Sequence, residues 1–458
     1  MNTKPPDPGS SSTGGEGSLE APTRHPLEWR SEAFYGTAAL DKELERVFDI
    51  CHGCRRCFNL CNSFPVLFDA VDATAEGEVA KIDKQVYWEV VDNCYLCDMC
   101  FMTKCPYVPP HPWNVDFPHL MLRAKAVRTR AEGLSLRDQT LAATRTVGSL
   151  AGIPVLAEIV NAVNHSAPGR LLLEKILGVD RSAPLPNYHS RTARRRLAHL
   201  GTTAEPAAAE ARATPATRGR VALFATCYGN RNEPQLDEDL AAILEHNGIE
   251  VALLPRERCC GMPRLELGDL EVVARLKEQN IPQLSAAVAA GFDILAPIPS
   301  CVLMFKQELP LMFPEDAHVR NVAEHTFDPF EYLMLRHQAG LLRTDFKARL
   351  GKISYHVPCH LRVQNLGLKT RDVLKLVPET TVEVIERCSG HNGTYGVKKK
   401  FRAASVKIGR PVVTRVQNAK ADHYSSDCPM AGHQIESGLG ESREPEHPLR
   451  LLRLAYGI

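Results

Sequence analysis

The sequence predicts a multidomain protein in which an α-helical, cysteine-rich module precedes a duplicated α/β half with largely parallel sheets. Three observations predict this fold class. Eight of the fifteen cysteines fall between residues 51 and 105. After residue 220, short apolar runs alternate with helical stretches, which is typical of parallel α/β layers. The same order of runs and cysteines then occurs a second time, which indicates an internal duplication.

The N-terminal stretch 1–26 is rich in Pro, Gly, Ser and Thr and has no apolar run, so we expect a disordered tail and no signal peptide. The most apolar stretch, 285–305, is interrupted by Asp293, Pro297 and Pro299, so no transmembrane segment is predicted. Fifteen cysteines without a secretion signal indicate a reducing compartment and metal or cluster ligation. We therefore expect a cytoplasmic protein, either free or peripheral on the cytoplasmic membrane face.

The chain carries 55 Lys and Arg against 54 Asp and Glu, a net charge of +1. This balance gives no global electrostatic reason to expect nucleic acid as a partner. A length of 458 residues is enough for two to four domains.

Two cysteine runs each place three cysteines at C-x2-C-x2-C spacing and add a fourth. The runs are Cys51, Cys54, Cys57, Cys61 and Cys94, Cys97, Cys100, Cys105. Bacterial-type ferredoxins hold two [4Fe-4S] clusters in this way, and the fourth cysteine of each run ligates the other cluster. We therefore predict one cluster on Cys51, Cys54, Cys57 and Cys105, and a second on Cys94, Cys97, Cys100 and Cys61.

Two details depart from the commonest ferredoxin spacing: Asn62 follows Cys61 where proline is usual, and four residues separate Cys100 from Cys105. A four-cysteine zinc site and a disulfide knot are the alternatives. A zinc ribbon needs only four ligands in two knuckles, and disulfide knots belong mainly to small secreted domains. Both alternatives therefore fit less well than two clusters. Arg55, Arg56 and Lys104 lie between the ligands, where positive charge would favour a reduced cluster or neutralise its thiolates.

In the C-terminal half, each strand-like run leads into a cysteine. The first set is Val221–Thr226 before Cys227, Val251–Leu254 before Cys259 and Cys260, and Asp293–Ile298 before Cys301. The second set is Ile353–Val357 before Cys359, Val382–Ile385 before Cys388, and Ala421–Ser425 before Cys428. Corresponding cysteines lie about 130 residues apart. Ligands of parallel sheets gather beyond the carboxyl ends of strands, which is where these cysteines fall.

These patterns divide the chain into seven segments. We expect a disordered tail (1–26), a helical ferredoxin-type module (27–150), a helical connector (151–200), a flexible linker (201–219), a first α/β repeat (220–345), a second α/β repeat (346–440) and a C-terminal tail (441–458).

The order of these modules resembles the iron-sulfur subunits of anaerobic glycerol-3-phosphate dehydrogenase and the wider heterodisulfide-reductase-related CCG family. The sequence motifs that match are Cys259-Cys260-Gly261-Met262-Pro263, the stretch Tyr355–Arg362 and the stretch Cys388–Gly396. The resemblance covers roughly residues 40 to 440. It implies electron transfer from a flavoprotein dehydrogenase partner to a quinone or another acceptor.

The chain departs from complete members of that family at three positions. Met304 and Ala431 stand where a closing cysteine of each repeat would be, and Ser389 replaces the second cysteine of the second CCG word. The first repeat keeps Cys227, Cys259, Cys260 and Cys301, which is enough for a further iron-sulfur cluster. The second keeps Cys359, Cys388 and Cys428, and would need a non-cysteine ligand such as His356, His360, His391 or His423. Alternatively, both repeats are inherited scaffolds whose cysteines line a pocket or dock a partner.

The basic run Lys398–Arg402 has two interpretations, a solvated helix face or a surface for an acidic partner or a quinone head group. No phosphate-binding loop of the Walker or G-x-G-x-x-G type occurs, so we expect no nucleotide or flavin site on this chain. The sequence therefore predicts an electron-transfer subunit. The alternatives are a catalytic iron-sulfur reductase, and an adaptor that docks another redox protein such as a di-iron peroxide-handling protein.

Overall fold

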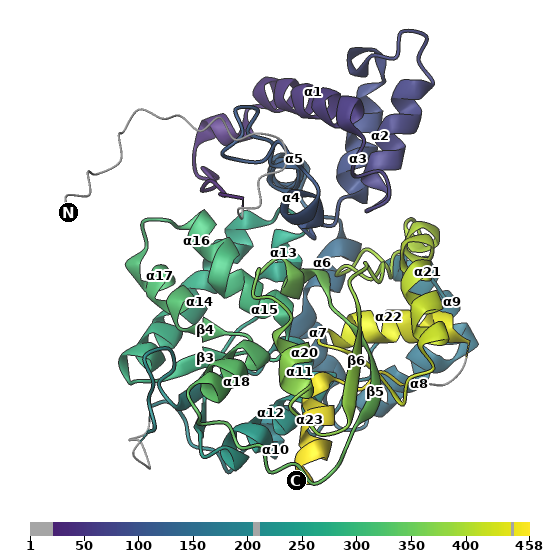
Figure 1. The fold of residues 1–458 in the computed structure, drawn as a ribbon. Helices are drawn as coiled ribbons and strands as arrows, with labels where there is room; N and C mark the ends of the chain where they lie inside the picture. Colours follow the sequence, from purple (N-terminus) through teal and green to yellow (C-terminus); the bar gives the residue numbers. More distant parts are fainter. Residues whose placement is uncertain (1–21, 205–210, 441–443) are drawn as a thin grey trace, which may run out of the picture.

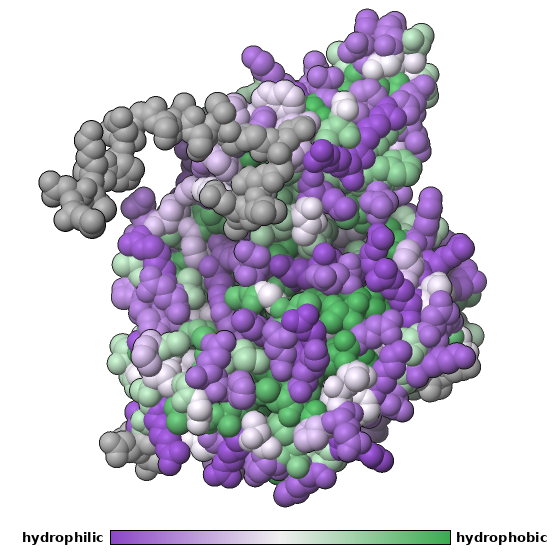
Figure 2. Space-filling view, in the orientation of Figure 1, coloured by the Kyte–Doolittle hydropathy of each residue, from purple (hydrophilic) through white to green (hydrophobic). Residues whose placement is uncertain are grey.

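The computed structural model describes residues 22–204, 211–440 and 444–458. In Figure 1 the N-terminal helices stand above two α/β repeats, and the helices that follow them run down beside the second repeat. Figure 2 shows the same face, with polar residues over most of it and an apolar area near its centre, below the N-terminal helices.

The N-terminal module is helical, as predicted. It comprises η1 (Glu32–Tyr35), α1 (Thr37–Cys54), α2 (Ser63–Asp72), η2 (Val79–Lys81), α3 (Lys84–Asn93), α4 (Met99–Thr103) and α5 (Phe117–Glu132). Helix α1 forms because Leu40, Leu44, Val47 and Phe48 recur at helical spacing and are buried on one face. It ends at Arg55, whose backbone is left-handed with φ 53°.

Five helices connect this module to the repeats. They are α6 (Leu136–Ala142), α7 (Thr144–Ala151), α8 (Leu156–His165), α9 (Ala167–Leu177) and α10 (Ala193–Arg196). Helix α9 begins at the N-cap Ser166, whose hydroxyl accepts from the Gly169 amide, and a proline follows in its first turn. Between α9 and α10 the chain has no long helix, so the predicted connector is helical only in its first half.

The first repeat contains a parallel sheet of order β2-β1-β3-β4. Its elements are β1 (Arg220–Leu223), α11 (Cys227–Arg231), α12 (Pro234–His246), β2 (Glu250–Leu253), α13 (Met262–Leu265), α14 (Leu270–Ala289), β3 (Asp293–Leu295), α15 (Pro299–Leu303), the π-helical η3 (Met304–Glu308), α16 (Leu309–Met312), α17 (Ala317–Glu324), β4 (Thr326–Phe327) and α18 (Pro329–Gln338). Val221 pairs with Val251 on one side of β1 and with Asp293 on the other.

The second repeat contains a parallel sheet of order β6-β5-β7, equivalent to the first three strands of the other sheet. Its elements are β5 (Gly351–His356), α19 (Cys359–Arg362), α20 (Lys369–Leu374), β6 (Thr380–Ile385), α21 (Arg402–Ala419), β7 (His423–Ser426) and α22 (Pro429–Leu439), followed by α23 (Pro448–Tyr456). The shared strand order confirms the predicted duplication with parallel sheets. In the first repeat β4 pairs in parallel with β3, and in the second Glu446 forms an isolated parallel bridge with Ser425 of β7.

The prediction of a C-terminal tail over residues 441–458 is wrong for residues 444–458, the part of it that the structure describes. Residues 444–458 end in α23, which packs against α12 of the first repeat. Leu449, Leu452 and Tyr456 are fully buried at this contact. The segment is thus a structural element of the core, because its apolar residues recur at helical spacing.

Two further segments differ from the sequence-based expectation. The linker over 201–219 is described at 201–204 and 211–219, and both parts are bound to the repeats: the Leu253 amide donates to the Gly201 carbonyl at 2.9 Å, and Thr217 is buried. Of the expected tail over 1–26, residues 1–21 lie outside the described part. In the remainder, the half-buried Arg24 forms ion pairs with Asp98 and Asp116.

No helix in the described ranges combines the length and the apolar character needed to cross a bilayer.

Candidate functional site

Four cysteines predicted to hold one cluster surround a common small cavity in the N-terminal module. Cys51 and Cys54 lie on the last turn of α1, Cys57 follows it and Cys105 follows α4. The lining residues are Ile50, Cys51, Cys54, Arg55, Arg56, Cys57, Phe64, Phe68, Lys104, Cys105, Pro106, Tyr107 and Val115. The cavity is therefore enclosed by four sulfurs, by aromatic and aliphatic side chains, and by the three basic residues singled out from the sequence.

Burial favours the protonated form of Cys51 and Cys57 in the absence of a ligand. Burial, with the nearby Cys105 and Cys54 thiols, raises the pKa of Cys57 to about 12, although Lys104 and Arg56 lower it. Burial likewise raises the pKa of Cys51, and the Cys57, Cys105 and Cys54 thiols add to this shift. A cation bound between the sulfurs would have to displace these protons, so binding releases them to solvent.

The other four predicted ligands form a second group. Burial raises the pKa of Cys61 to about 12, with Cys94 as the next contributor. Burial also raises the pKa of Cys100, with Cys57 of the first group as the next contributor, followed by Cys94 and Cys61. The chain curls here because two residues of the second run, Leu96 and Asp98, adopt left-handed backbone conformations with φ 51° and 58°.

This second group lies against the second α/β repeat, which the sequence did not predict. The Cys359 thiol hydrogen-bonds to Cys97 and lowers its pKa, but burial and neighbouring thiols bring the net value to about 12. Cys388 in turn contacts Cys359. Three polar groups surround the Cys388 sulfur: the Tyr95 hydroxyl at 3.5 Å, the Gly390 amide at 3.3 Å and the Asn392 side-chain amide at 3.4 Å.

A buried charge network joins the same cysteine loop to the first repeat. Arg24 Nη1 lies 2.6 Å from Asp98 and its Nε 2.9 Å from Asp116, the N-cap of α5. Glu308, at the end of the π-helical η3, is 3.7 Å from Arg24 and 3.6 Å from His119. Because Asp98 stands between Cys97 and Cys100, this network positions the second cysteine group relative to the first repeat.

The first repeat brings its four cysteines together at the carboxyl ends of β1, β2 and β3. The thiols of Cys227 and Cys260 hydrogen-bond to Cys259 and lower its pKa well below the usual value. Cys301 is close enough to Cys260 to hydrogen-bond with it. The pKa values of Cys227 and Cys260 are raised by their hydrogen bonds to Cys259 and by burial, so Cys259 becomes a thiolate before these two. Gly261, at φ 109°, allows the turn that follows Cys260.

Thr144 of α7 is a site residue that sequence reasoning missed. Its hydroxyl donates to the Cys227 sulfur at 3.2 Å and lies 3.9 Å from the Cys259 sulfur. Met304, which replaces the closing cysteine, is fully buried beside Gly261. No local sequence pattern marks Thr144, because it reaches the cysteines from a helix more than eighty residues earlier.

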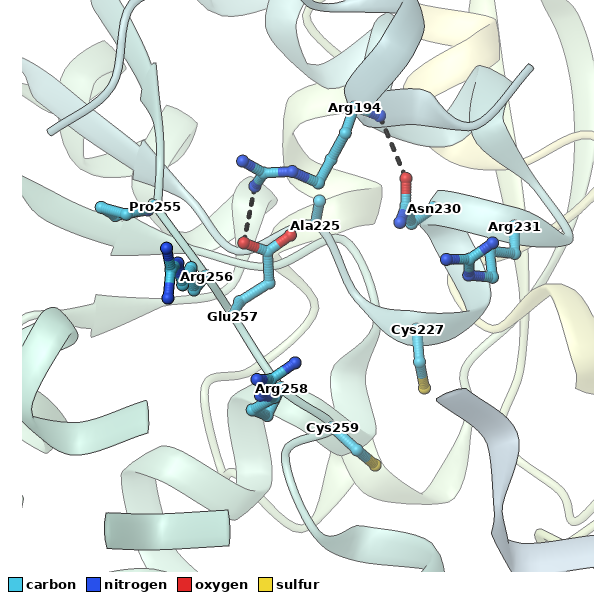
Figure 3. A pocket seen from close by; sticks show the side chains of 10 residues that line it. All are labelled: Arg194, Ala225, Cys227, Asn230, Arg231, Pro255, Arg256, Glu257, Arg258 and Cys259. Atoms are coloured by element: carbon cyan, nitrogen blue, oxygen red, sulfur yellow. Dashed lines mark hydrogen bonds and ion pairs between the residues drawn. The ribbon is translucent and has the colours of Figure 1, made fainter. Parts of the chain in front are cut away.

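A cavity of about 440 Å³ opens beside two of these cysteines. Its lining residues are Arg194, Ala225, Cys227, Asn230, Arg231, Pro255, Arg256, Glu257, Arg258 and Cys259. Figure 3 shows the Arg194 guanidinium turned to Glu257, and the two sulfurs lying on the other side of the cavity. Four of the ten lining residues are arginines, so the cavity is strongly basic.

The second repeat does not gather its three cysteines as the first repeat does. Cys359 and Cys388 meet the Cys97 loop, whereas Cys428 lies near Asp427 and Glu266, and burial raises its pKa to about 11. Ser389 is buried, and its hydroxyl accepts from the His391 amide at 3.4 Å.

The four histidines considered as substitute ligands have different surroundings. His356 contacts Ser426 and the Arg387 carbonyl, and burial lowers its pKa to about 4. His423 pairs with Glu446 at 2.6 Å, and His360 contacts the Ser300 hydroxyl at 2.8 Å. The ring nitrogens of His391 are buried without a partner among the described residues.

In the basic run Lys398–Arg402, the three lysines form ion pairs with carboxylates of other elements. Lys398 pairs with Asp138 at 2.6 Å, Lys399 with Glu174 at 2.8 Å and Lys400 with Asp92 at 2.7 Å. These carboxylates belong to α3, α6 and α9, so the run ties the second repeat to the N-terminal half.

The donor sets fit iron-sulfur clusters. All fifteen cysteines lie within the described residues, and none forms a disulfide. Among those residues, no three His, Cys, Asp or Glu side chains are gathered tightly enough to share a single metal ion. The first cysteine group instead encloses a cavity with all-sulfur donors and apolar walls, which suits a cubane.

Comparison with known proteins gives consistent matches. The family model "Cysteine-rich domain" (CCG) matches residues 221–306 and 353–436, the two α/β repeats. The subunit designated C of anaerobic glycerol-3-phosphate dehydrogenase from Escherichia coli (strain K12) is 30% identical over 346 residues, covering 75% of this chain and 83% of that protein. The subunit designated B of fumarate reductase (CoM/CoB) from Methanothermobacter marburgensis is 25% identical over 247 residues, which cover 52% of this chain and 46% of that protein. "Lactate utilization protein A" from Bacillus pumilus is 28% identical over 247 residues, which cover 52% of this chain and 97% of that protein.

The match to the glycerol-3-phosphate dehydrogenase protein spans most of both chains, and the CCG repeats coincide with the two sheets. The chain therefore belongs to the family of this anaerobic glycerol-3-phosphate dehydrogenase subunit, within the wider heterodisulfide-reductase-related proteins that carry paired CCG domains.

Proposed function

We propose that this protein is the iron-sulfur electron-transfer subunit of an oxidoreductase complex. Its donor would be a flavoprotein dehydrogenase subunit, of the glycerol-3-phosphate dehydrogenase type, and its acceptor a quinone or another redox partner. The observation that carries the proposal is the cavity enclosed by Cys51, Cys54, Cys57 and Cys105, together with the second four-cysteine group beside it. The names of the relatives, which are dehydrogenase and reductase subunits, support the same role.

In this proposal, Cys51, Cys54, Cys57 and Cys105 hold one [4Fe-4S] cluster, and Cys94, Cys97, Cys100 and Cys61 hold the other. Such clusters exchange single electrons at potentials set by their surroundings. The aromatic and aliphatic side chains that line the first cavity limit the access of water to its sulfurs. Arg56 and Lys104 place positive charge at the same cavity, which favours the more negative, reduced state.

We also propose a further iron-sulfur cluster on Cys227, Cys259, Cys260 and Cys301 of the first repeat. Hydrogen bonds link these thiols in a chain, from Cys227 to Cys259, to Cys260 and to Cys301, and Thr144 donates a hydrogen bond to the Cys227 sulfur. The second repeat is proposed to bind no cluster of its own, because it keeps only three cysteines, Cys359, Cys388 and Cys428. Instead, Cys359 and Cys388 complete the protein environment of the second cubane.

An exposed apolar surface supports peripheral attachment to the cytoplasmic membrane face, where a quinone acceptor would be found. Nine of the fourteen large exposed hydrophobic residues in the described part of the chain fall between residues 136 and 176. They are Leu136, Leu150, Ile153, Val155, Leu156, Ile159, Leu171, Leu172 and Ile176. These residues belong to α6–α9 and the loop between α7 and α8, and these helices pack on one another. Apolar side chains concentrated in this way favour insertion into the headgroup region of a bilayer.

A second candidate function is a catalytic iron-sulfur reductase, and the cavity beside Cys227 and Cys259 favours it because a small substrate could reach the sulfurs. In that case the purified chain would reduce a substrate without a flavoprotein. An adaptor role would instead give a protein that captures a redox partner but shows no cubane signals.

The test is anaerobic purification with iron counting and electron paramagnetic resonance of the dithionite-reduced protein. We expect about twelve irons per chain, four for each proposed cluster. Cys54→Ser should abolish one N-terminal cubane signal, and Cys227→Ser should remove about four irons while leaving both cubane signals. Cys428→Ser is the matched control and should change neither.

Cubane signals that survive intact in Cys54→Ser would refute the N-terminal ligand assignment. A wild-type protein with about eight irons and a Cys227→Ser spectrum identical to it would remove the third cluster from the proposal. Co-purification that recovers no flavoprotein would count against the dehydrogenase partner.

A further inference from the structure

The lining of the cavity beside Cys227 and Cys259 contains four guanidinium groups but only one carboxylate. Its only acidic lining residue, Glu257, is already paired: Arg194 Nη1 lies 2.6 Å from the Glu257 carboxylate. This pair is visible as a dashed line in Figure 3. No carboxylate of the cavity lining is therefore left to pair with the guanidinium groups of Arg231, Arg256 and Arg258.

None of these three guanidinium groups has a carboxylate partner among the described residues. Arg231 donates to the Gly148 carbonyl at 3.1 Å, and Arg258 donates to the Gln279 side chain at 3.1 Å. Both partners are neutral. No ion pair in residues 22–204, 211–440 and 444–458 includes the Arg256 side chain, which is exposed at the cavity.

The fold explains why these groups converge. Arg256 and Arg258 follow β2, Arg231 ends α11 after β1, and these two strands are adjacent and parallel. Their carboxyl ends therefore open on the same side of the sheet, the usual place for a ligand in α/β proteins. The volume of about 440 Å³ lies in the range of small-molecule sites rather than of flat protein interfaces.

We propose that this cavity is a binding site for a small polyanion, a molecule that carries two or more carboxylate or phosphate groups. Guanidinium groups bind carboxylate and phosphate oxygens through paired, charge-assisted hydrogen bonds. Three unneutralised guanidinium groups match at least two such anionic groups. The site goes beyond the proposed electron-transfer role, because the arginines that form it are not ligands of any proposed cluster.

Two probes separate the possible sources of the anion. Inorganic pyrophosphate represents phosphate groups, and citrate represents carboxylate groups. Binding of each to the anaerobically purified full chain is measured by isothermal titration calorimetry at constant ionic strength. We expect one site per chain for at least one probe, with binding that weakens as NaCl is raised.

The decisive variant is Arg256→Gln/Arg258→Gln, which keeps side chains of similar length and removes two positive charges. We expect it to weaken probe binding by about tenfold or more. The matched control is Arg410→Gln/Arg415→Gln, which removes the same charge from exposed positions on α21 of the other repeat and should leave binding unchanged. Arg231→Gln is a second, independent variant if the first fails to fold, judged by circular dichroism.

Several outcomes would overturn the proposal. Neither probe binding to the wild-type chain, or equal loss in the cavity variant and the α21 control, would show that these arginines form no anion site. A hexaglutamate peptide that binds far more tightly than both probes would replace the small molecule with an acidic protein segment. The iron count and cubane signals are measured on the same samples, so loss of clusters and loss of anion binding are distinguished.

Discussion

The Tyr95 hydroxyl lies 3.5 Å from the Cys388 sulfur, so the residue that follows the first cysteine of the second run touches the second α/β repeat. The rings of Tyr95 and Tyr395 also pack with their centroids 5.0 Å apart. The second cysteine group is therefore enclosed partly by a domain that lies almost three hundred residues later in the chain.

Replacing Tyr95 with phenylalanine tests this contact. Tyr95→Phe keeps the ring packing but removes a buried hydroxyl from Cys388, so we expect the free energy of unfolding to fall by about 1 kcal/mol in urea titrations. The control is Tyr35→Phe, because the Tyr35 hydroxyl forms no hydrogen bond with any described residue and its loss should be nearly neutral. Equal effects of the two variants would contradict a specific role for the Tyr95–Cys388 contact.

Removing Arg24 should be strongly destabilising. Arg24→Ala leaves Asp98, Asp116 and Glu308 without their shared cation, and Asp98 and Glu308 are only 7% and 5% exposed. We expect the free energy of unfolding to fall by about 3–5 kcal/mol. Arg24→Lys should cost less because it keeps the positive charge, but it should still cost stability because an ammonium group cannot form the same forked contacts. Arg46→Ala, which breaks an exposed pair with Glu43, should cost about 0.5 kcal/mol or less. Similar losses for Arg24→Ala and Arg46→Ala would refute the network's role.

The buried carboxyl of Asp328 should make stability fall as pH rises. Burial, followed by the negative charges of Asp427 and Glu331, raises the pKa of Asp328 to about 8 from its ordinary value of 3.8. Between these values the folded state binds more protons than the unfolded state, so raising the pH favours unfolding. We expect Asp328→Asn to retain the cap of α18 and to reduce the stability lost between pH 5 and pH 8 by on the order of 2 kcal/mol.

The measurement for Asp328 is urea denaturation of wild type and Asp328→Asn across this pH range. Comparing the two proteins removes the contributions of titrating groups that do not interact with Asp328. Asp427, whose pKa burial raises to about 6, does interact with Asp328, so the difference between the two proteins reports on the pair. Parallel stability curves for the two proteins would rule out Asp328 as a source of the pH dependence.

Neutralising the basic run should weaken the attachment of the second repeat. Lys398→Gln/Lys399→Gln/Lys400→Gln breaks three ion pairs to α3, α6 and α9. Lys399 and Lys400 are more than 60% exposed, so we expect a total loss of only about 1 kcal/mol at low salt, and less at high salt. The charge-matched control is Lys407→Gln/Arg410→Gln/Arg415→Gln on the exposed face of α21. An acidic partner that binds wild type and triple variant equally would agree with these lysines being internal tethers.

Local patterns were sufficient for much of the fold. The strands before Cys227, Cys259 and Cys301 follow from short apolar runs that a buried parallel strand requires. In the second repeat the pattern is weaker, because β6 alternates polar and apolar residues and β7 reads His-Tyr-Ser-Ser. The C-terminal helix could also have been found, since Leu449, Leu452 and Tyr456 recur at helical spacing after a proline at the first helical position. Arg24 and Thr144 could not, because each acts on residues more than seventy positions away.

The sequence by itself determined the donor chemistry: the number and spacing of cysteines in each group, the duplication, and the missing ligands at Ser389, Met304 and Ala431. Each of these features can be predicted from a short segment, because the local geometry of such a segment depends mainly on residues close to it in the sequence. Only the tertiary structure decided which groups meet: Cys359 and Cys388 with the Cys97 loop, Lys398–Lys400 with acidic residues of the N-terminal half, and three arginines around one cavity. Such contacts depend on how whole domains pack, because packing brings together side chains that no local pattern relates.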